Sequence, residues 1–339
     1  MRKFAVILPS LLFFFAGVAT TAAQPPLKLV AKYKMPAAVS GHFDHLAVDV
    51  AGNRLFAACE TAGEVLVFNL RTGELEHTIT GIGIPHAIHV SDRLNRIFVT
   101  DGGVGGVQVF NGKTYDLVKF IPLRLDTDSI AYDPKTGYLY VVSGGDHLAE
   151  QFSYISVIDT KTETKVADIR LDGNTLEAMA LAKSSPMLYN NDPALNQINV
   201  INRDTHKLVA TWPVTMCDHN VAIALDEAAH RLFTACHSGE VVAFDTQTGQ
   251  QVAAVPIAHG VDDMIFDPAT NRLYVTCGAD GGWIYVYHIV GPDSYVLLGR
   301  VAGAPFSKNE VLAPSLNRLY TTVPPNAGVP GEIYVYQVQ

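Results

Sequence analysis

The chain has 339 residues, of which 48% are hydrophobic and 17% are charged, and its formal net charge at pH 7 is −9. This composition is typical of a globular protein with a large core. Because the sequence contains no run rich in Lys and Arg, binding of nucleic acid through a basic face is disfavoured.

The first residues have the pattern of a secretory signal peptide. Arg2-Lys3 is a basic n-region, Phe4–Val18 is an apolar h-region, and Thr21-Ala22-Ala23 offers small residues for cleavage. We expect residues 1–23 to be removed and residues 24–339 to form a periplasmic or secreted domain. No later stretch is long and apolar enough to span a membrane, so we expect no membrane span after cleavage.

After a first candidate strand at Leu27–Lys34, one pattern recurs along the chain. A polar turn precedes an aromatic and β-branched run, which predicts a strand entered from a tight turn. The seven runs begin at Arg54, Arg96, Tyr138, Met187, Arg231, Arg272 and Arg318. Their spacings are 42, 42, 49, 44, 41 and 46 residues. A period in this range, filled by short strands, is typical of a β-propeller.

Each repeat contains four candidate strands. In the first repeat, Leu46–Val48 is a short apolar strand, the run after it is the second, Val65–Phe68 alternates, and Glu74–Ile79 is half polar. The seventh repeat stops at its third strand, Ile333–Tyr336. We therefore predict one all-β domain, a seven-bladed β-propeller of four-stranded antiparallel blades. The N-terminal strand 27–34 would complete the last blade and close the ring.

Two runs carry a resemblance to a known family. Arg272-Leu273-Tyr274-Val275-Thr276 and Arg96-Ile97-Phe98-Val99-Thr100, with Asp-x-x-Thr-Gly turns, resemble the YVTN-repeat seven-bladed β-propellers of the exported bacterial type. The resemblance covers nearly the whole chain after the signal peptide. It implies the fold and leaves the function open, because the wider group contains lactonases, lyases, electron-transfer subunits and binding proteins.

The repeat assigns residues to one face of the ring. In such blades, the loops from fourth to first strand and from second to third strand share a face, here called the top face. Ten residues before each second strand, the chain reaches the mouth of the central channel. The residues there are Asp44, His86, Asp128, Glu177, Val221, Asp262 and Lys308. His and carboxylate groups bind metals and transfer protons. We expect ligand binding by Asp44, His86, Asp128, Glu177, His219, Asp262 and Glu310.

Two residues depart from the pattern of the first strand. Glu310 stands in the seventh blade where the other six have a large apolar residue, and His89 stands in the second blade on a face where small residues dominate. A buried carboxylate or imidazole must be paired or shift its pKa. Glu310 is therefore either a channel residue or the sign of a register slip in the last blade. His89 is interpreted as a satisfied core histidine.

His42 and His45 are the tightest local pair of histidines. Two imidazoles three residues apart on a loop can converge on one ion if Asp44, His86 or Glu177 supplies a third ligand. The sequence leaves two interpretations open. In the first, His42, His45 and His86 are ligands of a divalent metal ion, which would be the cofactor. In the second, they are ordinary loop residues hydrogen-bonded to the backbone.

All four cysteines map to the top face: Cys59, Cys217, Cys236 and Cys277. An even number of cysteines in an oxidising compartment favours disulfides. Cys217–Cys236 is one possible pair, but the pairing does not follow from the sequence. Buried apolar thiols and metal ligation are the alternatives.

Two functions lead. The first is a monomeric exported propeller that binds a small molecule, a saccharide or a protein through its top face and channel mouth. The second is a metal-assisted lactonase or polysaccharide lyase with His86, His219 and Glu177 as candidate catalytic groups. A purely structural role is the third. Binding is ranked first because the sequence contains no complete catalytic motif such as Gly-x-Ser-x-Gly.

Overall fold

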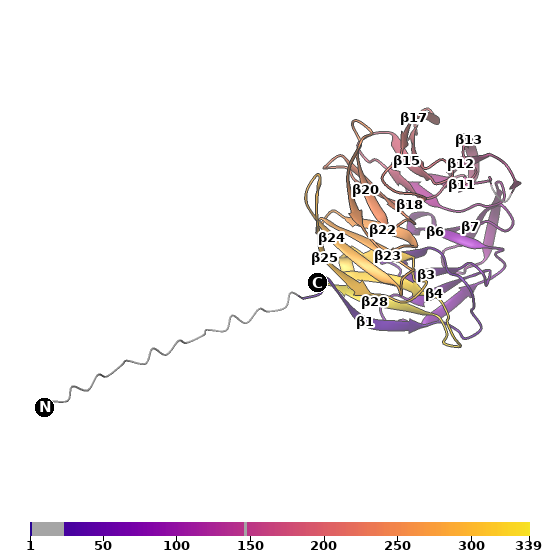
Figure 1. The fold of residues 1–339 in the computed structure, drawn as a ribbon. Helices are drawn as coiled ribbons and strands as arrows, with labels where there is room; N and C mark the ends of the chain where they lie inside the picture. The colour runs from indigo at the N-terminus through magenta and orange to yellow at the C-terminus, as the bar shows by residue number, and fades with distance from the viewer. Residues whose placement is uncertain (2–23, 146–147) are drawn as a thin grey trace.

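A computed structural model describes residues 1, 24–145 and 148–339 (Figure 1). Within these residues the chain forms seven four-stranded antiparallel sheets arranged as the blades of a propeller. The predicted fold class is therefore confirmed. Residues 2–23, which hold nearly all of the predicted signal peptide, lie outside the described residues. Over the part of the chain that is described, no helix has the length and apolar character needed to cross a membrane.

The inner half of each blade consists of a first strand beside the channel and a second strand behind it. The first strands are β2 (Leu46–Asp49), β6 (Pro85–Ser91), β10 (Ile130–Asp133), β14 (Met179–Leu181), β18 (Asn220–Asp226), β22 (Val261–Asp267) and β26 (Glu310–Ala313). The second strands are β3 (Arg54–Cys59), β7 (Arg96–Asp101), β11 (Tyr138–Ser143), β15 (Met187–Asp192), β19 (Arg231–Cys236), β23 (Arg272–Cys277) and β27 (Arg318–Val323). Every second strand begins at the residue that the repeat predicted.

The outer half of each blade consists of a third and a fourth strand. The third strands are β4 (Glu64–Asn69), β8 (Gly106–Asn111), β12 (Phe152–Asp159), β16 (Gln197–Asn202), β20 (Glu240–Asp245), β24 (Trp283–Gly291) and β28 (Glu332–Val338). The fourth strands are β5 (Leu75–Ile79), β9 (Leu117–Pro122), β13 (Thr164–Asp172), β17 (Lys207–Pro213), β21 (Gln251–Pro256), β25 (Ser294–Ala302) and β1 (Leu27–Lys34). Two 3-10 turns, η1 (Asp92–Leu94) and η3 (Pro314–Leu316), join first to second strands.

The turn before many second strands explains the asparagines of the repeat. Asn53, Asn95, Asn271 and Asn317 have φ between 49° and 57°, in the left-handed region. Asparagine adopts this conformation more readily than most residues because its short side chain bonds to nearby backbone. The asparagine of the Asn-Arg signature is therefore a consequence of turn geometry.

The N-terminal strand closes the ring as predicted. Strand β1 pairs antiparallel with β28 from Leu27 opposite Val338 to Lys34 opposite Glu332. Tyr33 is buried between the last and first blades, its ring 6.4 Å from that of Phe68 and 6.3 Å from that of Tyr320. Pairing and burial together remove the open sheet edge that β28 would otherwise present. Figure 1 shows the two ends of the domain side by side.

The core lies between neighbouring blades. One cluster joins Phe56 and Val65 of the first blade to Ile97 and Val99 of the second. Since each blade packs its second strand against the next blade, the apolar layer continues around the ring. The first strands also contribute to these clusters, as Leu46, Ala131 and Met264 do.

Candidate functional site

The seven residues that stand ten positions before the second strands converge on one cavity. This cavity, here called the channel mouth, has a volume of about 150 Å³. Its ring positions are Asp44, His86, Asp128, Glu177, Val221, Asp262 and Lys308. Each blade supplies one of them from the loop or strand end that enters its first strand. His45 and Glu60 also line the mouth, so five carboxyl groups face two imidazoles and one ammonium group.

The centre of the mouth is a group of three side chains from three consecutive blades. One ligand atom each of Asp44, His86 and Asp128 lies within 4.8 Å of the other two. His86 Nδ1 is 2.5 Å from Asp44 Oδ2. Among the described residues, this is the group of three His, Cys, Asp or Glu side chains whose atoms are close enough to hold a metal ion together.

Close packing fixes the imidazole of His86 in this group. Gly102, in the loop after β7, lies against the ring, and a Cβ on Gly102 would be 2.8 Å from His86 Nε2. Gly102 also donates its backbone N–H to the carbonyl of Ile84, at 2.9 Å. The glycine therefore leaves space that the His86 ring occupies.

Mutual electrostatics sets the protonation of the three groups. Burial would raise the pKa of Asp44, but the charge of His45 and the hydrogen bond with His86 hold that pKa well below its usual range. Burial disfavours the charged imidazole, yet Asp128 and Asp44 raise the pKa of His86 to about 9. Burial also raises the pKa of Asp128 to about 6, against the charge of His86. In the absence of a cation, a proton on His86 balances the carboxylates.

Glu177, like Asp128, is a carboxyl group of the mouth whose pKa is raised by burial. Burial, with the nearby negative charges of Asp128 and Asp262, raises its pKa well above the usual range. The neutral acid form is therefore favoured. A carboxyl group held in this form beside a cluster of metal-type ligands can donate a hydrogen bond or transfer a proton to a bound molecule.

A second set of interactions anchors the opposite side of the mouth. Lys308 Nζ lies 2.8 Å from Asp262 Oδ2. Asn309 donates its side-chain amide to Asp262 at 2.8 Å and to Asp44 at 3.3 Å. Asn309 is fully buried, so this amide ties two acidic groups of the ring together. The sequence pattern did not point to Asn309, because an amide next to a charged position looks like any loop residue.

His45 lines both the mouth and a second cavity. Its Nε2 is 3.6 Å from Asp44 Oδ1, and its Nδ1 is 3.1 Å from Asp263 Oδ1. Burial lowers the pKa of His45, but Asp263 and Asp44 outweigh it and raise that pKa well above its usual range. A further cavity of about 290 Å³ lies along the channel and shares His45 with the mouth.

Glu310 and His89 both line this channel cavity. Glu310 stands in register opposite Thr321, so no register slip accounts for it. One carboxyl oxygen accepts a hydrogen bond from Thr276 at 2.6 Å, and the other has no hydrogen-bond partner among the described residues. His89 stacks on Tyr132 at 4.1 Å, but its Nε2 also lacks such a partner. His89 therefore lines the channel cavity with an unpaired ring nitrogen, and the structure does not support its interpretation as a satisfied core histidine.

Six predicted site residues do not join the central group, and of these His45, Glu177 and Asp262 still line the mouth. His42 is exposed, and His45 is engaged by Asp44 and Asp263, so the structure does not bring the predicted set His42, His45 and His86 together. His219 is exposed and stacks on His237 at 4.6 Å, outside the residues that line the mouth. Glu310 lies in the channel cavity instead of the mouth.

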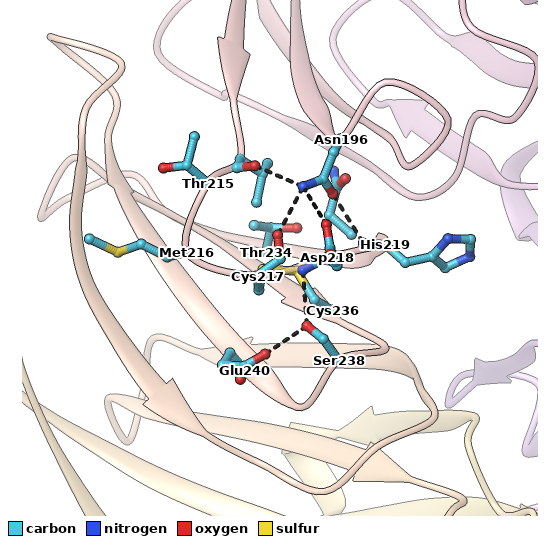
Figure 2. Close-up of a disulfide and its surroundings, with 12 residues drawn as sticks. Asn196, Thr215, Met216, Cys217, Asp218, His219, Thr234, Cys236, Ser238 and Glu240 are labelled. Carbon is cyan, nitrogen blue, oxygen red and sulfur yellow. Dashed lines mark hydrogen bonds between the residues drawn. A yellow bond between two sulfur atoms is a disulfide. The ribbon is translucent and has the colours of Figure 1, made fainter.

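The cysteines separate into one disulfide and two buried thiols. Cys217 and Cys236 are bonded, with their Cα atoms 6.1 Å apart, which is the pair that the blade arrangement allowed (Figure 2). Cys59 and Cys277 are free and buried. Burial raises the pKa of the Cys277 thiol to about 12 and that of Cys59 above its usual range. Neither thiol is part of the group that could hold an ion.

Figure 2 shows how the disulfide holds the entry to the fifth blade. Asn196 donates its side-chain amide to the carbonyl of Cys217 at 2.9 Å and accepts the backbone N–H of His219 at 3.0 Å. The His219 ring points away from the sulfur atoms. This loop is therefore fixed from both neighbouring blades, and His219 is left at the surface of the top face.

Comparison with known proteins confirms the fold and leaves the function open. No family model matches the chain. The uncharacterized protein YncE of Salmonella typhi is 33% identical over 101 residues, which is 29% of this chain and 28% of that protein, and YncE of Salmonella typhimurium gives the same values. The match thus spans little more than a quarter of these curated relatives.

A solved structure resembles the whole chain. A chain in the crystal structure of the mitotic checkpoint complex superposes with a TM-score of 0.75 and covers 98% of this chain and 99% of its own length. The sequence identity is 13%, so the likeness shows the β-propeller fold alone. What the protein does must be inferred from its own channel mouth.

Proposed function

We propose that this protein is an exported propeller of the YVTN-repeat type that binds a divalent metal ion at the channel mouth and uses the ion to hold a ligand on the top face. The observation that carries the proposal is the convergence of Asp44, His86 and Asp128, with one ligand atom of each within 4.8 Å of the others. The propeller fold supports a binding role because its ring of loops presents many side chains to one axis.

The ligand types favour a particular class of ion. One imidazole and two carboxylates suit Zn²⁺, Mn²⁺ or Fe²⁺, whereas Ca²⁺ and Mg²⁺ prefer sites of oxygen ligands only. Three protein ligands leave coordination positions open for a bound molecule. The excess of carboxyl groups in the mouth further favours a cation over an anion.

Metal titration of the purified protein tests the proposal. Protein treated with a chelator should bind Zn²⁺ or Mn²⁺ with a stoichiometry of one, measured by calorimetry and elemental analysis. His86→Ala and Asp128→Asn should abolish this binding. His259→Ala is the matched control, because His259 is a top-face histidine whose side chain is 65% exposed and outside the mouth. Unchanged binding in His86→Ala, or no binding by the wild type, would exclude the site.

The export part of the proposal rests on the pattern of residues 1–23. Expression of the full chain in a bacterium, followed by fractionation and mass spectrometry, should recover a periplasmic or secreted protein that begins near Gln24. Recovery of the uncleaved chain in the cytoplasm would contradict it.

Glu177 favours a second candidate, a metal-assisted lactonase or lyase. It lines the same cavity as the three candidate ligands, and burial raises its pKa in the direction that a general acid requires. Turnover of a lactone or a uronate polysaccharide should then require both the metal and Glu177. If Glu177→Gln leaves such turnover unchanged, Glu177 is not the acid.

A further inference from the structure

A second cavity adjoins the channel mouth between the third and fourth blades. This cavity, here called the side pocket, has a volume of about 210 Å³. It shares Asp128 and Glu177 with the mouth. Its other polar lining residues are Asp126, Ser143, Ser153 and Thr175. The two cavities therefore meet at one candidate metal ligand and at the carboxyl group of raised pKa.

Ser143 points to a ligand in the side pocket. It is the last residue of β11 and is 2% exposed, and its hydroxyl group is buried without a hydrogen-bond partner among the described residues. Ser153, in the same pocket, differs because its hydroxyl donates to the carbonyl of Gly173 at 3.1 Å. An unpaired buried hydroxyl costs free energy. A molecule that fills the pocket would remove this cost.

The repeat shows that Ser143 is unusual at its position. Cys59, Cys236 and Cys277 end the equivalent strands of three other blades with sulfur atoms. Asp101 and Asp192 end the equivalent strands of two more blades, and adjoining loops donate hydrogen bonds to their carboxylates. Asp101 accepts the backbone N–H groups of Gly83 and Ile84 at 2.8 and 3.0 Å. Asp192 accepts the N–H of Leu195 at 3.1 Å and the side-chain amide of Gln197. The hydroxyl of Ser143 has no such role in its own blade.

Charge and size define what the side pocket can hold. Asp126 and Asp128 supply acceptors and disfavour anions, while the hydroxyl groups and the carboxyl group of Glu177 both donate and accept. A volume of about 210 Å³ is below the range of about 300–1,000 Å³ of pockets for drug-sized ligands. A mostly apolar molecule would leave the polar lining unsatisfied.

We infer that the side pocket binds an uncharged, hydroxyl-rich molecule of about monosaccharide size, one end of which reaches the metal ion at Asp128. This inference rests on the proposed metal-binding function and adds the ligand class. Ser143 would contact the ligand directly through its hydroxyl group. The ion would accept hydroxyl oxygens of the same molecule at its open positions.

Binding of defined probes to the metal-loaded protein tests the inference. D-glucose, D-mannitol and myo-inositol are the neutral probes, gluconate is the anionic probe and glucosamine the cationic one, each followed by saturation-transfer NMR and calorimetry. At least one neutral probe should bind, and more tightly than gluconate. Ser143→Ala should weaken it about threefold to tenfold, the effect of one lost hydrogen bond. Tightest binding of glucosamine, or no neutral probe bound, would overturn the inference.

Two further measurements separate the possible failures. Ser143→Ala should bind metal like the wild type and unfold at no lower temperature, because its hydroxyl group makes no hydrogen bond to any described residue of the free protein. Ser238→Ala, a top-face serine outside the side pocket, should bind the probe normally. If the protein binds the metal ion but none of the neutral probes, the proposed ligand class is rejected and the proposed metal site is kept. Probe binding without metal would reject the proposed function and keep the pocket.

Discussion

Replacing Gly102 by alanine tests whether the position of His86 matters for metal binding. A Cβ at this position would lie 2.8 Å from Nε2 and 3.1 Å from Cδ2 of the His86 ring, whereas ordinary contacts begin at 3.4 Å. The ring must therefore retreat by about 0.6 Å, the difference between 3.4 and 2.8 Å. Metal–ligand distances tolerate only about 0.2 Å. His86 would no longer fit the group formed with Asp44 and Asp128.

The expected effect is a loss of metal affinity with the fold retained. Losing the support of a ligating histidine costs about 10- to 100-fold in affinity, which is about 1.4–2.7 kcal/mol. Gly102 is not among the glycines of positive φ, so alanine adds no backbone strain there. The His86 side chain can rotate away, and the nearest backbone atom is 3.5 Å from the new Cβ.

Calorimetric titration of the chelator-treated variant with Zn²⁺ or Mn²⁺ measures this effect. Circular dichroism and a thermal melt establish that Gly102→Ala is folded. Gly303→Ala is the matched control, since its new Cβ would meet nothing closer than 3.6 Å and its φ is not positive. Wild-type affinity in a folded Gly102→Ala variant would refute the placement of His86 in the metal site.

Three other predictions concern stability. Burial lowers the pKa of His89 to about 4 in the folded protein. As pH falls below about 6.5, the His89 imidazole of the unfolded chain is protonated before that of the folded chain. Stability is therefore lost between about pH 6.5 and about pH 4. This lowering of the pKa corresponds to about 3 kcal/mol of stability. Between neutral and acid pH, urea unfolding of His89→Asn should therefore show a loss of stability smaller than that of the wild type by about 2–3 kcal/mol; an equal loss would contradict this. Thiol titration of the denatured protein without reductant should detect two free thiols, because Cys217 and Cys236 are bonded; four reactive thiols would exclude the disulfide. In urea unfolding, a Cys217→Ser/Cys236→Ser variant should be about 3 kcal/mol less stable than the wild type. Deleting residues 24–34 removes β1 and leaves the outer edge of β28 unpaired, while β28 keeps its pairing with β27. Gel filtration should therefore show aggregation, whereas Leu29→Lys, at a 40% exposed position, should stay monomeric; a monomeric deletion variant would argue against closure by β1.

The repeat was enough to predict the ring of residues around the channel. Counting ten positions back from each second strand selected Asp44, Asp128 and Glu177, and the same count selected Lys308. This works because four-stranded blades of nearly constant length bring equivalent positions to the same height on the axis. Local motifs could not have joined these residues, since 264 positions separate Asp44 from Lys308 (308 − 44).

Side-chain direction and packing could not be read from the repeat. His219 looked like a mouth residue, but its backbone is left-handed, with φ of 61°, and its ring stacks on His237 at the surface. His42 and His45 are close in sequence, yet one is exposed and the other bridges Asp44 and Asp263. A loop that enters a strand alternates and twists, so spacing alone does not decide which of its side chains meet.

The sequence by itself thus determined the number of blades, the starts of the second strands and the closure by the N-terminal strand, because these follow from a repeated pattern of turns and apolar runs. Only the tertiary structure selected three of the seven mouth residues as neighbours, and only it revealed the unpaired hydroxyl of Ser143. These features depend on rotamers and on contacts between blades. Such contacts are set by packing across the ring and leave no local signature in the chain.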